Sequence, residues 1–138
     1  MLVDYTPEQM YALVDAVESY PEFLPWCGGT VVLARDEART RATIMIDYRG
    51  IKQKFSTENA KERPSQIVMR LVEGPFRHLD GNWQFQALGA GACKVRLQLN
   101  YEFPSRLLEK LVGPVFDYIA TSFVEAFVAR AAKVYGVK

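Results

Sequence analysis

Polar and apolar residues alternate with a period of two from Thr30 to Phe103, a stretch that covers more than half of the chain. Turn-forming residues at Arg49-Gly50, Arg63-Pro64-Ser65 and Gly89-Ala90-Gly91 divide this stretch into short runs. Because successive side chains of a strand point to opposite faces, each run has one apolar and one polar face. Such runs predict six consecutive strands in an antiparallel meander, with one face in water and the other covered.

The inward positions of these strands are mostly apolar, which identifies the candidate core. They are Ala42, Ile44, Ile46 and Tyr48; Ile51, Gln53 and Phe55; Ile67, Met69 and Leu71; Gly81, Trp83 and Phe85; and Val95, Leu97, Leu99 and Tyr101. Asn59 falls on the same face, so Tyr48, Gln53, Asn59 and Tyr101 are polar groups on an otherwise apolar face. Buried polar groups need hydrogen-bond partners.

The cover for this face is expected from the C-terminal segment. Apolar residues recur there at spacings of three and four from Leu107 to Ala131, which predicts an amphipathic helix running to about Tyr135. Gly113-Pro114 interrupts the pattern, and because proline lacks a backbone N–H, we expect a kink or a break there. The fold class is therefore α+β, in one domain over residues 1–138.

The N-terminal segment predicts two short helices. Thr6-Pro7-Glu8-Gln9 combines a capping threonine, a proline at the first helical position and a capping-box glutamine. Pro21 and Pro25 leave room only for a short second helix at Pro21–Leu24. Cys27-Gly28-Gly29 is expected to form a turn before the first strand of the meander.

Charge is distributed unevenly although the net charge is only +1. Residues 1–34 contain five acidic residues and no Lys or Arg, whereas the remainder contains 17 basic and 11 acidic residues. Alternation places a basic set on the wet face of the sheet: Arg41, Lys52, Lys54, Arg70, Lys94 and Arg96. This basic set could contact RNA or anionic lipid, or could simply be a solvated face.

Neither the termini nor the cysteines indicate export. The first residues lack a basic segment followed by an apolar core, and no uncharged apolar run reaches the roughly 18 residues of a membrane span. Cys27 and Cys93 form no disulfide framework or metal-spaced cluster, and either could be redox-active or a small buried hydrophobe. We expect a cytoplasmic protein, with peripheral contact to the inner membrane as a further option.

The chain offers no recognisable catalytic set. Its single histidine, His78, is expected in a loop between strands with no serine or cysteine next to it. No phosphate-binding glycine loop or zinc spacing is present in the sequence. We therefore expect a binding protein that needs no cofactor and no metal, with no catalytic residues.

Several motifs occur together in a fixed order. They are Tyr20-Pro21-Glu22-Phe23-Leu24-Pro25-Trp26-Cys27, then Glu73-Gly74-Pro75-Phe76-Arg77-His78-Leu79 with Gly81 and Trp83, and then Tyr101-Glu102-Phe103 with Leu107-Leu108-Glu109 and Gly113-Pro114-Val115-Phe116. With this order of elements, the chain resembles the coenzyme Q-binding, polyketide cyclase-like START-domain family. Some bacterial members of that family are named ribosome association toxin RatA or oligoketide cyclase. One departure is the first strand, of which only Leu2 to Tyr5 remain.

The resemblance implies a helix-grip (START-like, SRPBCC) fold, in which a curved antiparallel sheet of six to seven strands wraps around the C-terminal helix. It also implies a hydrophobic tunnel between sheet and helix, a ligand such as ubiquinone and, for members named RatA, binding to the large ribosomal subunit. On this basis we expect ligand contacts from Phe23, Trp26, Phe76, Trp83, Phe85, Leu97, Tyr101, Leu108, Val112 and Phe116. Pro21–Leu24 and Gly113-Pro114 are expected to flank the mouth of the tunnel.

Three functions follow in order of preference. The first is a non-enzymatic carrier or chaperone for a hydrophobic ligand, a polyprenyl quinone or another lipid, that supports respiration. The second is a protein that binds the large ribosomal subunit through the basic set and blocks subunit association. The third is a cyclase-type enzyme, which ranks last because the sequence lacks a catalytic set.

Overall fold

The structure of the protein is a computed structural model, which describes residues 1–136. All seven strands form one antiparallel sheet in the order β1-β7-β6-β5-β4-β3-β2. The elements are β1 (Leu2–Val3), α1 (Pro7–Asp15), the 3-10 helix η1 (Val17–Glu22), β2 (Cys27–Arg35), β3 (Arg39–Tyr48), β4 (Ile51–Glu62), β5 (Gln66–Glu73), β6 (His78–Ala87), β7 (Cys93–Glu102) and α2 (Arg106–Tyr135). The meander is confirmed, because every neighbouring pair from β2 to β7 is consecutive in the chain.

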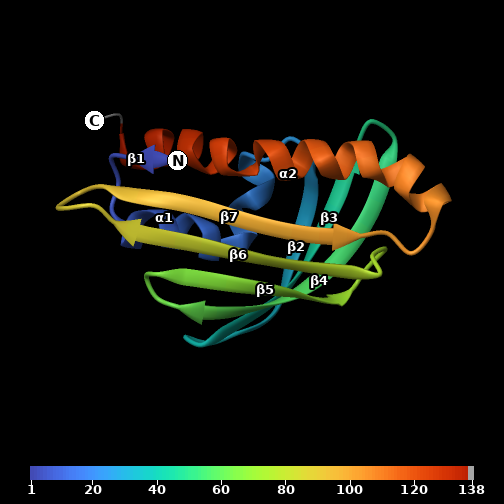
Figure 1. Cartoon of the computed structure of the whole chain (residues 1–138), viewed down its shortest axis with the longest axis horizontal. Coiled ribbons are helices and arrows are strands. Elements are labelled where there is room, and N and C mark those ends of the chain that lie inside the picture. The colour runs from blue at the N-terminus through green and yellow to red at the C-terminus, as the bar shows by residue number, and fades with distance from the viewer. Residues whose placement is uncertain (137–138) are drawn as a thin grey trace.

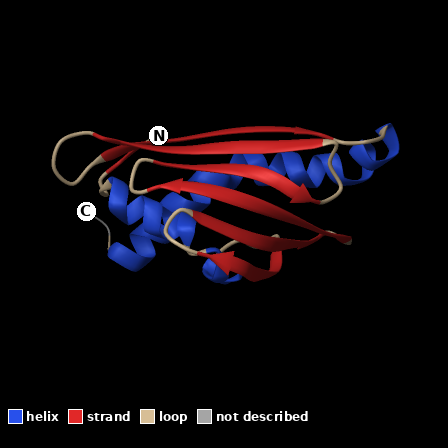
Figure 2. Ribbon diagram, turned by 90° about the horizontal axis from the view of Figure 1, so that it is seen from below, coloured by secondary structure: helices blue, strands red, loops and turns tan. Residues whose placement is uncertain are grey.

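The sheet curves around α2, which runs beside β7 in Figure 1 and behind the strands in Figure 2. Aromatic contacts join the two layers: the Phe55 ring lies 6.2 Å from Phe116, and the Trp83 ring lies 5.7 Å from Phe123. The expected helix-grip fold is confirmed. By length and composition α2 is also apolar enough to cross a membrane, a test that the core helix of a globular fold can pass.

Alternation identified the covered face of the sheet correctly. Ile44, Ile46, Ile67, Trp83 and Val95 are all less than 8% exposed, and each is an inward position of its strand. The long helix contributes Phe116, Ile119, Phe123 and Phe127 to the same core. Burial of this apolar surface is the main stabilising term of the fold.

The capped start of α1 is confirmed. The Thr6 hydroxyl accepts a hydrogen bond from the Gln9 backbone N–H at 3.1 Å, and the Gln9 side chain accepts one from the Thr6 N–H at 2.8 Å. The second helix lies earlier than predicted, at Val17–Glu22 rather than Pro21–Leu24. Pro21 is tolerated there because a short 3-10 helix requires few backbone donors.

The expected turn at Cys27-Gly28-Gly29 is wrong, because these residues begin β2. The strand register shifts between Cys27 and Gly29. Outward side chains of β3 lie across the glycines, and a Cβ on Gly28 would come within 2.9 Å of the Asp47 Cβ. These glycines therefore permit a close approach between strands rather than a change of chain direction.

Of the kink or break expected at Gly113-Pro114, the break is wrong, because α2 is continuous through Pro114. Pro114 cannot donate to the carbonyl of Lys110, four residues earlier. Lys110 and Pro114 both lie on the exposed side of the helix. Water can therefore reach the free carbonyl, and the helix continues.

The first strand is short, as expected. Leu2 and Val3 pair with Lys94 and Cys93 of β7. The Met1 amino group donates to the Val95 carbonyl at 2.8 Å, which extends the contact by one residue.

Candidate functional site

An enclosed cavity lies between the inner face of the sheet and α2. It has a volume of about 30 Å³, enough for one or two water molecules. Its wall comes from η1, from the five strands β3 to β7 and from the middle of α2. The lining residues are Val17, Tyr20, Ala42, Ile44, Phe55, Thr57, Asn59, Met69, Leu79, Gly81, Leu99, Phe116, Ile119 and Phe123.

This void lies between the sheet and α2, where the ligand tunnel is expected, but a volume of about 30 Å³ is far smaller than a ligand tunnel. Of the ten residues expected to contact a ligand, only Phe116 lines the cavity. Trp83, Phe85 and Val112 are buried outside the cavity wall, and Leu97, Tyr101 and Leu108 are partly exposed. Alternation gives the face on which a side chain lies but not its position along the strand, so it could not locate the void.

The other expected ligand contacts surround the cavity without lining it. The Phe76 ring lies 4.8 Å from that of Phe116, and the Trp26 ring lies 5.7 Å from that of Phe123. The Phe23 ring lies 6.1 Å from that of Tyr20. These aromatic side chains support residues of the cavity wall and would respond to a ligand indirectly.

Besides Tyr20, two polar side chains of β4 interrupt the apolar wall. The hydroxyl of Thr57 donates to Oδ1 of Asn59 at 2.9 Å, and the residues are 3% and 8% exposed. Asn59 was one of four polar residues expected on the inward face, and it is the only one of them in the cavity wall. Tyr48 instead stacks on Tyr118 with a centroid distance of 5.3 Å.

Tyr101 is half-buried outside the cavity and donates a hydrogen bond to Asp117 of α2. Burial, together with that hydrogen bond, raises the pKa of Tyr101 to about 12. Its ring packs against Phe116 with a centroid distance of 4.5 Å. Tyr101 therefore fixes α2 against β7 next to the cavity.

Tyr20 is the titratable residue of the cavity wall. Its hydroxyl donates to the backbone carbonyl of Val14, which joins η1 to α1. Burial raises the pKa of Tyr20 far above its usual range, and the carboxylate of Asp15 acts in the same direction. The phenol is therefore neutral at physiological pH and acts as a fixed wall.

The expected basic set lies on the outer face of the sheet but in three separate groups. Arg41 and Arg70 share Glu58 with Arg39, at distances of 3.1 to 3.7 Å. The hydrogen bond from Arg41 lowers the pKa of the Glu58 carboxyl. Lys94 and Arg96 lie near the start of β7, opposite Gln86 and Gln84 of β6.

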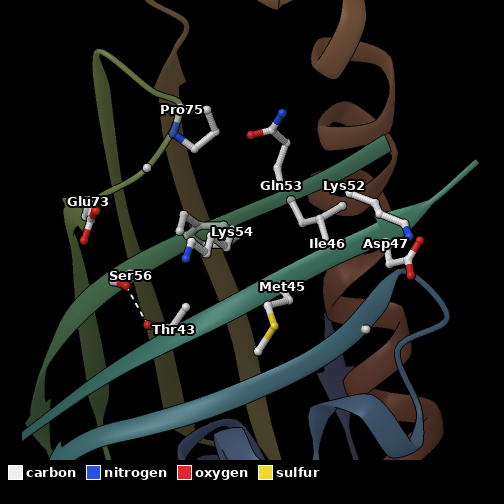
Figure 3. A pocket seen from close by; sticks show the side chains of 13 residues that line it. Thr43, Met45, Ile46, Asp47, Lys52, Gln53, Lys54, Ser56, Glu73 and Pro75 are labelled. Carbon is white, nitrogen blue, oxygen red and sulfur yellow. Dashed lines mark hydrogen bonds between the residues drawn. The ribbon is translucent and has the colours of Figure 1, made fainter. Parts of the chain in front are cut away.

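Lys52 and Lys54, the third group, border a groove of about 740 Å³ on the outer face (Figure 3). The groove runs over β3 and β4 to the segment after β5, and it also holds the carboxylates of Asp47 and Glu73. In the part of the chain that the structure describes, neither lysine forms an ion pair. Among the described residues Lys94 and Arg96 form no ion pair either, so Lys52 and Lys54 differ from them in bordering the groove.

The comparison with protein families gives a match over residues 3–128 to the family described as polyketide cyclase / dehydrase and lipid transport. The chain belongs to this family. A relative from Vibrio cholerae named "Ribosome association toxin RatA" is 43% identical over 98% of this chain and 94% of its own length. A Xenopus laevis relative named "Coenzyme Q-binding protein COQ10 homolog B, mitochondrial" is 28% identical over 98% of this chain and 57% of its own length.

The fold of this polyketide cyclase / dehydrase family member also matches solved structures. The Zhui aromatase/cyclase from Streptomyces sp. R1128 superposes with a TM-score of 0.82 over 95% of this chain and 89% of that chain, at 14% identity. This similarity shows the fold alone. The family description names polyketide cyclase, dehydrase and lipid transport, whereas the two relatives are named for ribosome association and for coenzyme Q binding.

The single histidine lies outside the cavity. His78 is the first residue of β6, not a loop residue as expected, and its Nε2 lies 2.6 Å from Oδ1 of the exposed Asp80. Leu79 is the neighbour that points into the cavity.

Cys27 and Cys93 are free and buried, and burial raises the pKa of both thiols. Both cysteines are therefore small core residues in this structure.

Proposed function

We propose that this protein binds a hydrophobic ligand, a polyprenyl quinone such as ubiquinone, without catalysing a reaction. The observation that carries the proposal is the cavity between sheet and α2, whose wall is apolar except for Tyr20, Thr57 and Asn59. Ligand pockets of this kind are mostly apolar with a few polar groups that orient the ligand. The relative named as a coenzyme Q-binding protein supports the choice of quinone.

Ligand binding requires the cavity to expand, because about 30 Å³ is too small for a quinone ring. The movable wall is the middle of α2, which contributes Phe116, Ile119 and Phe123. Burial of about 300 Å² of isoprenoid surface contributes about 7 kcal/mol at about 25 cal/mol per Å². Such a gain can offset the partial separation of α2 from the sheet.

The wall of the cavity supports binding rather than catalysis. General acid–base catalysis needs a group that gains or loses a proton near neutral pH. Tyr20 is the wall's titratable side chain, and its pKa is raised away from neutrality. His78 and Asp80 lie on the opposite face of β6. The proposed mechanism is therefore sequestration of the ligand from water.

Quinone titration monitored by tryptophan fluorescence tests this proposal. Trp26 and Trp83 both contact Phe123 of the cavity wall, so a bound quinone should quench their emission. Ala42→Leu, which fills the cavity, should weaken binding at least tenfold. Ala131→Leu is the matched control, because Ala131 is equally buried but lies outside the cavity. Equal affinities of wild type and Ala42→Leu would contradict the proposal.

A second candidate is association with the large ribosomal subunit. It is favoured by the relative named as a ribosome association toxin and by the unpaired Lys52 and Lys54 in the outer groove. RNA phosphates attract such cations, and binding weakens as salt displaces them. Cosedimentation with ribosomal subunits should be lost in Lys52→Glu/Lys54→Glu and retained in Lys94→Glu/Arg96→Glu. Equal cosedimentation of both double variants would exclude the groove.

A further inference from the structure

Two polar side chains next to each other on the inner face of the sheet each have a polar group without a hydrogen-bond partner. Thr40 is 0% exposed, and its hydroxyl has no partner. Asn59 lies directly opposite it in the register of β3 and β4. The one hydrogen bond of the Asn59 side chain uses Oδ1, so its amide nitrogen, with two N–H donors, lacks an acceptor in the described part of the chain.

The fold alone does not require these polar groups. The buried Thr40 hydroxyl without a partner costs about 1–3 kcal/mol, so an apolar side chain of similar size would be more stable at this position. The neighbouring inward positions of β3 are apolar, with Ala42 and Ile44 lining the cavity. Thr40, Thr57 and Asn59, which we call the polar cluster, are therefore an exception within an apolar surface.

The polar cluster lies at the cavity. Thr57 and Asn59 line its wall, and Thr40 is the cross-strand neighbour of Asn59. Directly opposed residues of antiparallel strands have Cβ atoms about 4.5–5.5 Å apart, so one ligand atom can reach both. The free groups of the cluster are the amide N–H donors of Asn59 and the hydroxyl of Thr40.

We propose that the polar cluster recognises a carbonyl oxygen on the buried end of the ligand. This inference rests on the proposed function and specifies its chemistry. The Asn59 amide donates one hydrogen bond to the carbonyl, the Thr40 hydroxyl donates a second, and Thr57 holds the Asn59 side chain in place through Oδ1. Asn59 and Thr40 thereby act as specificity residues.

The cluster gives selectivity that apolar contact cannot give. A hydrophobic pocket discriminates weakly between ligands of similar shape, whereas a site with hydrogen-bonding groups rejects an analogue that leaves them unpaired. A carbonyl compound should therefore bind more tightly than a hydrocarbon of the same length. Each hydrogen bond should change affinity by a factor of roughly 3–30.

Calorimetric titration with two probes, a decyl-substituted benzoquinone and decylbenzene, tests the inference. Wild type should bind the quinone about 10–100 times more tightly than decylbenzene. Asn59→Leu should remove most of that preference and leave decylbenzene affinity within about threefold. Thr40→Val, which keeps the side-chain shape, should reduce quinone affinity by a smaller factor. Asn82→Leu is the matched control, because the Asn82 Oδ1 is also buried without a hydrogen-bond partner but lies on the outward side of β6 and not in the cavity wall.

The outcomes separate this inference from the proposed function. If wild type binds neither probe, the proposed function fails. If wild type binds both probes equally, the cavity binds apolar ligands but the polar cluster does not select them. If Asn59→Leu raises stability and leaves quinone affinity unchanged, the cluster holds only water and the inference is overturned. Thr40→Val provides the same test if Asn59→Leu does not fold.

Discussion

Truncation of Ile119 to alanine should destabilise the empty protein and improve its response to ligand. Ile119 is 1% exposed and lines the cavity from the middle of α2. Loss of three carbon atoms removes about 2.4 kcal/mol of transfer free energy at about 0.8 kcal/mol per carbon. A void enlarged by about 50–80 Å³ adds about 1–2 kcal/mol at about 24 cal/mol per Å³. The expected loss is therefore about 4 kcal/mol.

Ligand should recover much of this loss. In a domain of this size, a loss of about 4 kcal/mol lowers Tm by roughly 12–20 °C. A ligand at 100 times its Kd returns about 2.7 kcal/mol by mass action. Because the enlarged cavity requires less displacement of α2, a short-chain quinone should raise the Tm of Ile119→Ala more than that of wild type.

The matched control for this experiment is Ile67→Ala. Ile67 is also 1% exposed, but it lies on β5 directly opposite Trp83 of β6 and does not line the cavity. Thermal unfolding with and without quinone should show a similar loss of Tm in both variants. Only Ile119→Ala should show the larger ligand-induced rise. Identical rises in both variants would refute the assignment of the cavity as the ligand site.

Three further predictions concern pH, the helix and its surface. Because the pKa of Tyr20 is raised in the folded state, the contribution of Tyr20 to the free energy of unfolding is fully present below the usual tyrosine pKa of 10.0 and falls as pH rises above it. Urea unfolding at alkaline pH should therefore show a smaller fall in the free energy of unfolding for Tyr20→Phe than for wild type. Since α2 is continuous through Pro114, Pro114→Ala should raise stability by up to about 3 kcal/mol and leave stopped-flow quinone exchange unchanged. Leu107 and Leu111 are 70% and 54% exposed on α2, so Leu107→Glu/Leu111→Glu should slow quinone transfer from anionic vesicles while equilibrium affinity for dissolved quinone stays the same. Unchanged transfer would indicate that this surface does not contact the bilayer.

The sheet and its covering helix were predictable because their patterns are long. Alternation through Ile44, Ile67 and Trp83 placed each side chain on the correct face, and spacing of three and four from Leu107 to Ala131 predicted α2. Short turn signals such as Cys27-Gly28-Gly29 predicted the structure less reliably. Gly28 lies in a strand, where the absence of a side chain lets the Asp47 side chain of β3 approach closely. No local sequence pattern encodes this tertiary contact.

The cavity itself was not predictable in detail. The pattern identified Asn59 as a polar residue on the inward face, and the structure places it in the wall. Thr40 has the same strand parity as Ala42, but it precedes Ala42, the first inward position of the predicted strand, so the alternation does not identify it. Its importance depends on the register of β3 against β4, which places it opposite Asn59.

The basic set shows the same limit of prediction from alternation. Alternation correctly put Arg41, Lys52, Lys54 and Arg96 on the outer face, but it could not show how they group along the sheet. Glu58 pairs with Arg41 across the strands, whereas Lys52 and Lys54 border the groove. The neutralisation of a charge depends on cross-strand neighbours, which only the register reveals.

Native mass spectrometry of the protein purified gently from its cells tests the central claim most directly. We predict a bound species in a ratio of one ligand to one chain, which releases a prenylated quinone on extraction. The species should be absent from Ala42→Leu, in which the cavity is filled, and present in Ala131→Leu. A wild-type protein that carries no ligand and takes up no quinone when supplied with it would contradict the claim, as would a ligand retained equally by Ala42→Leu.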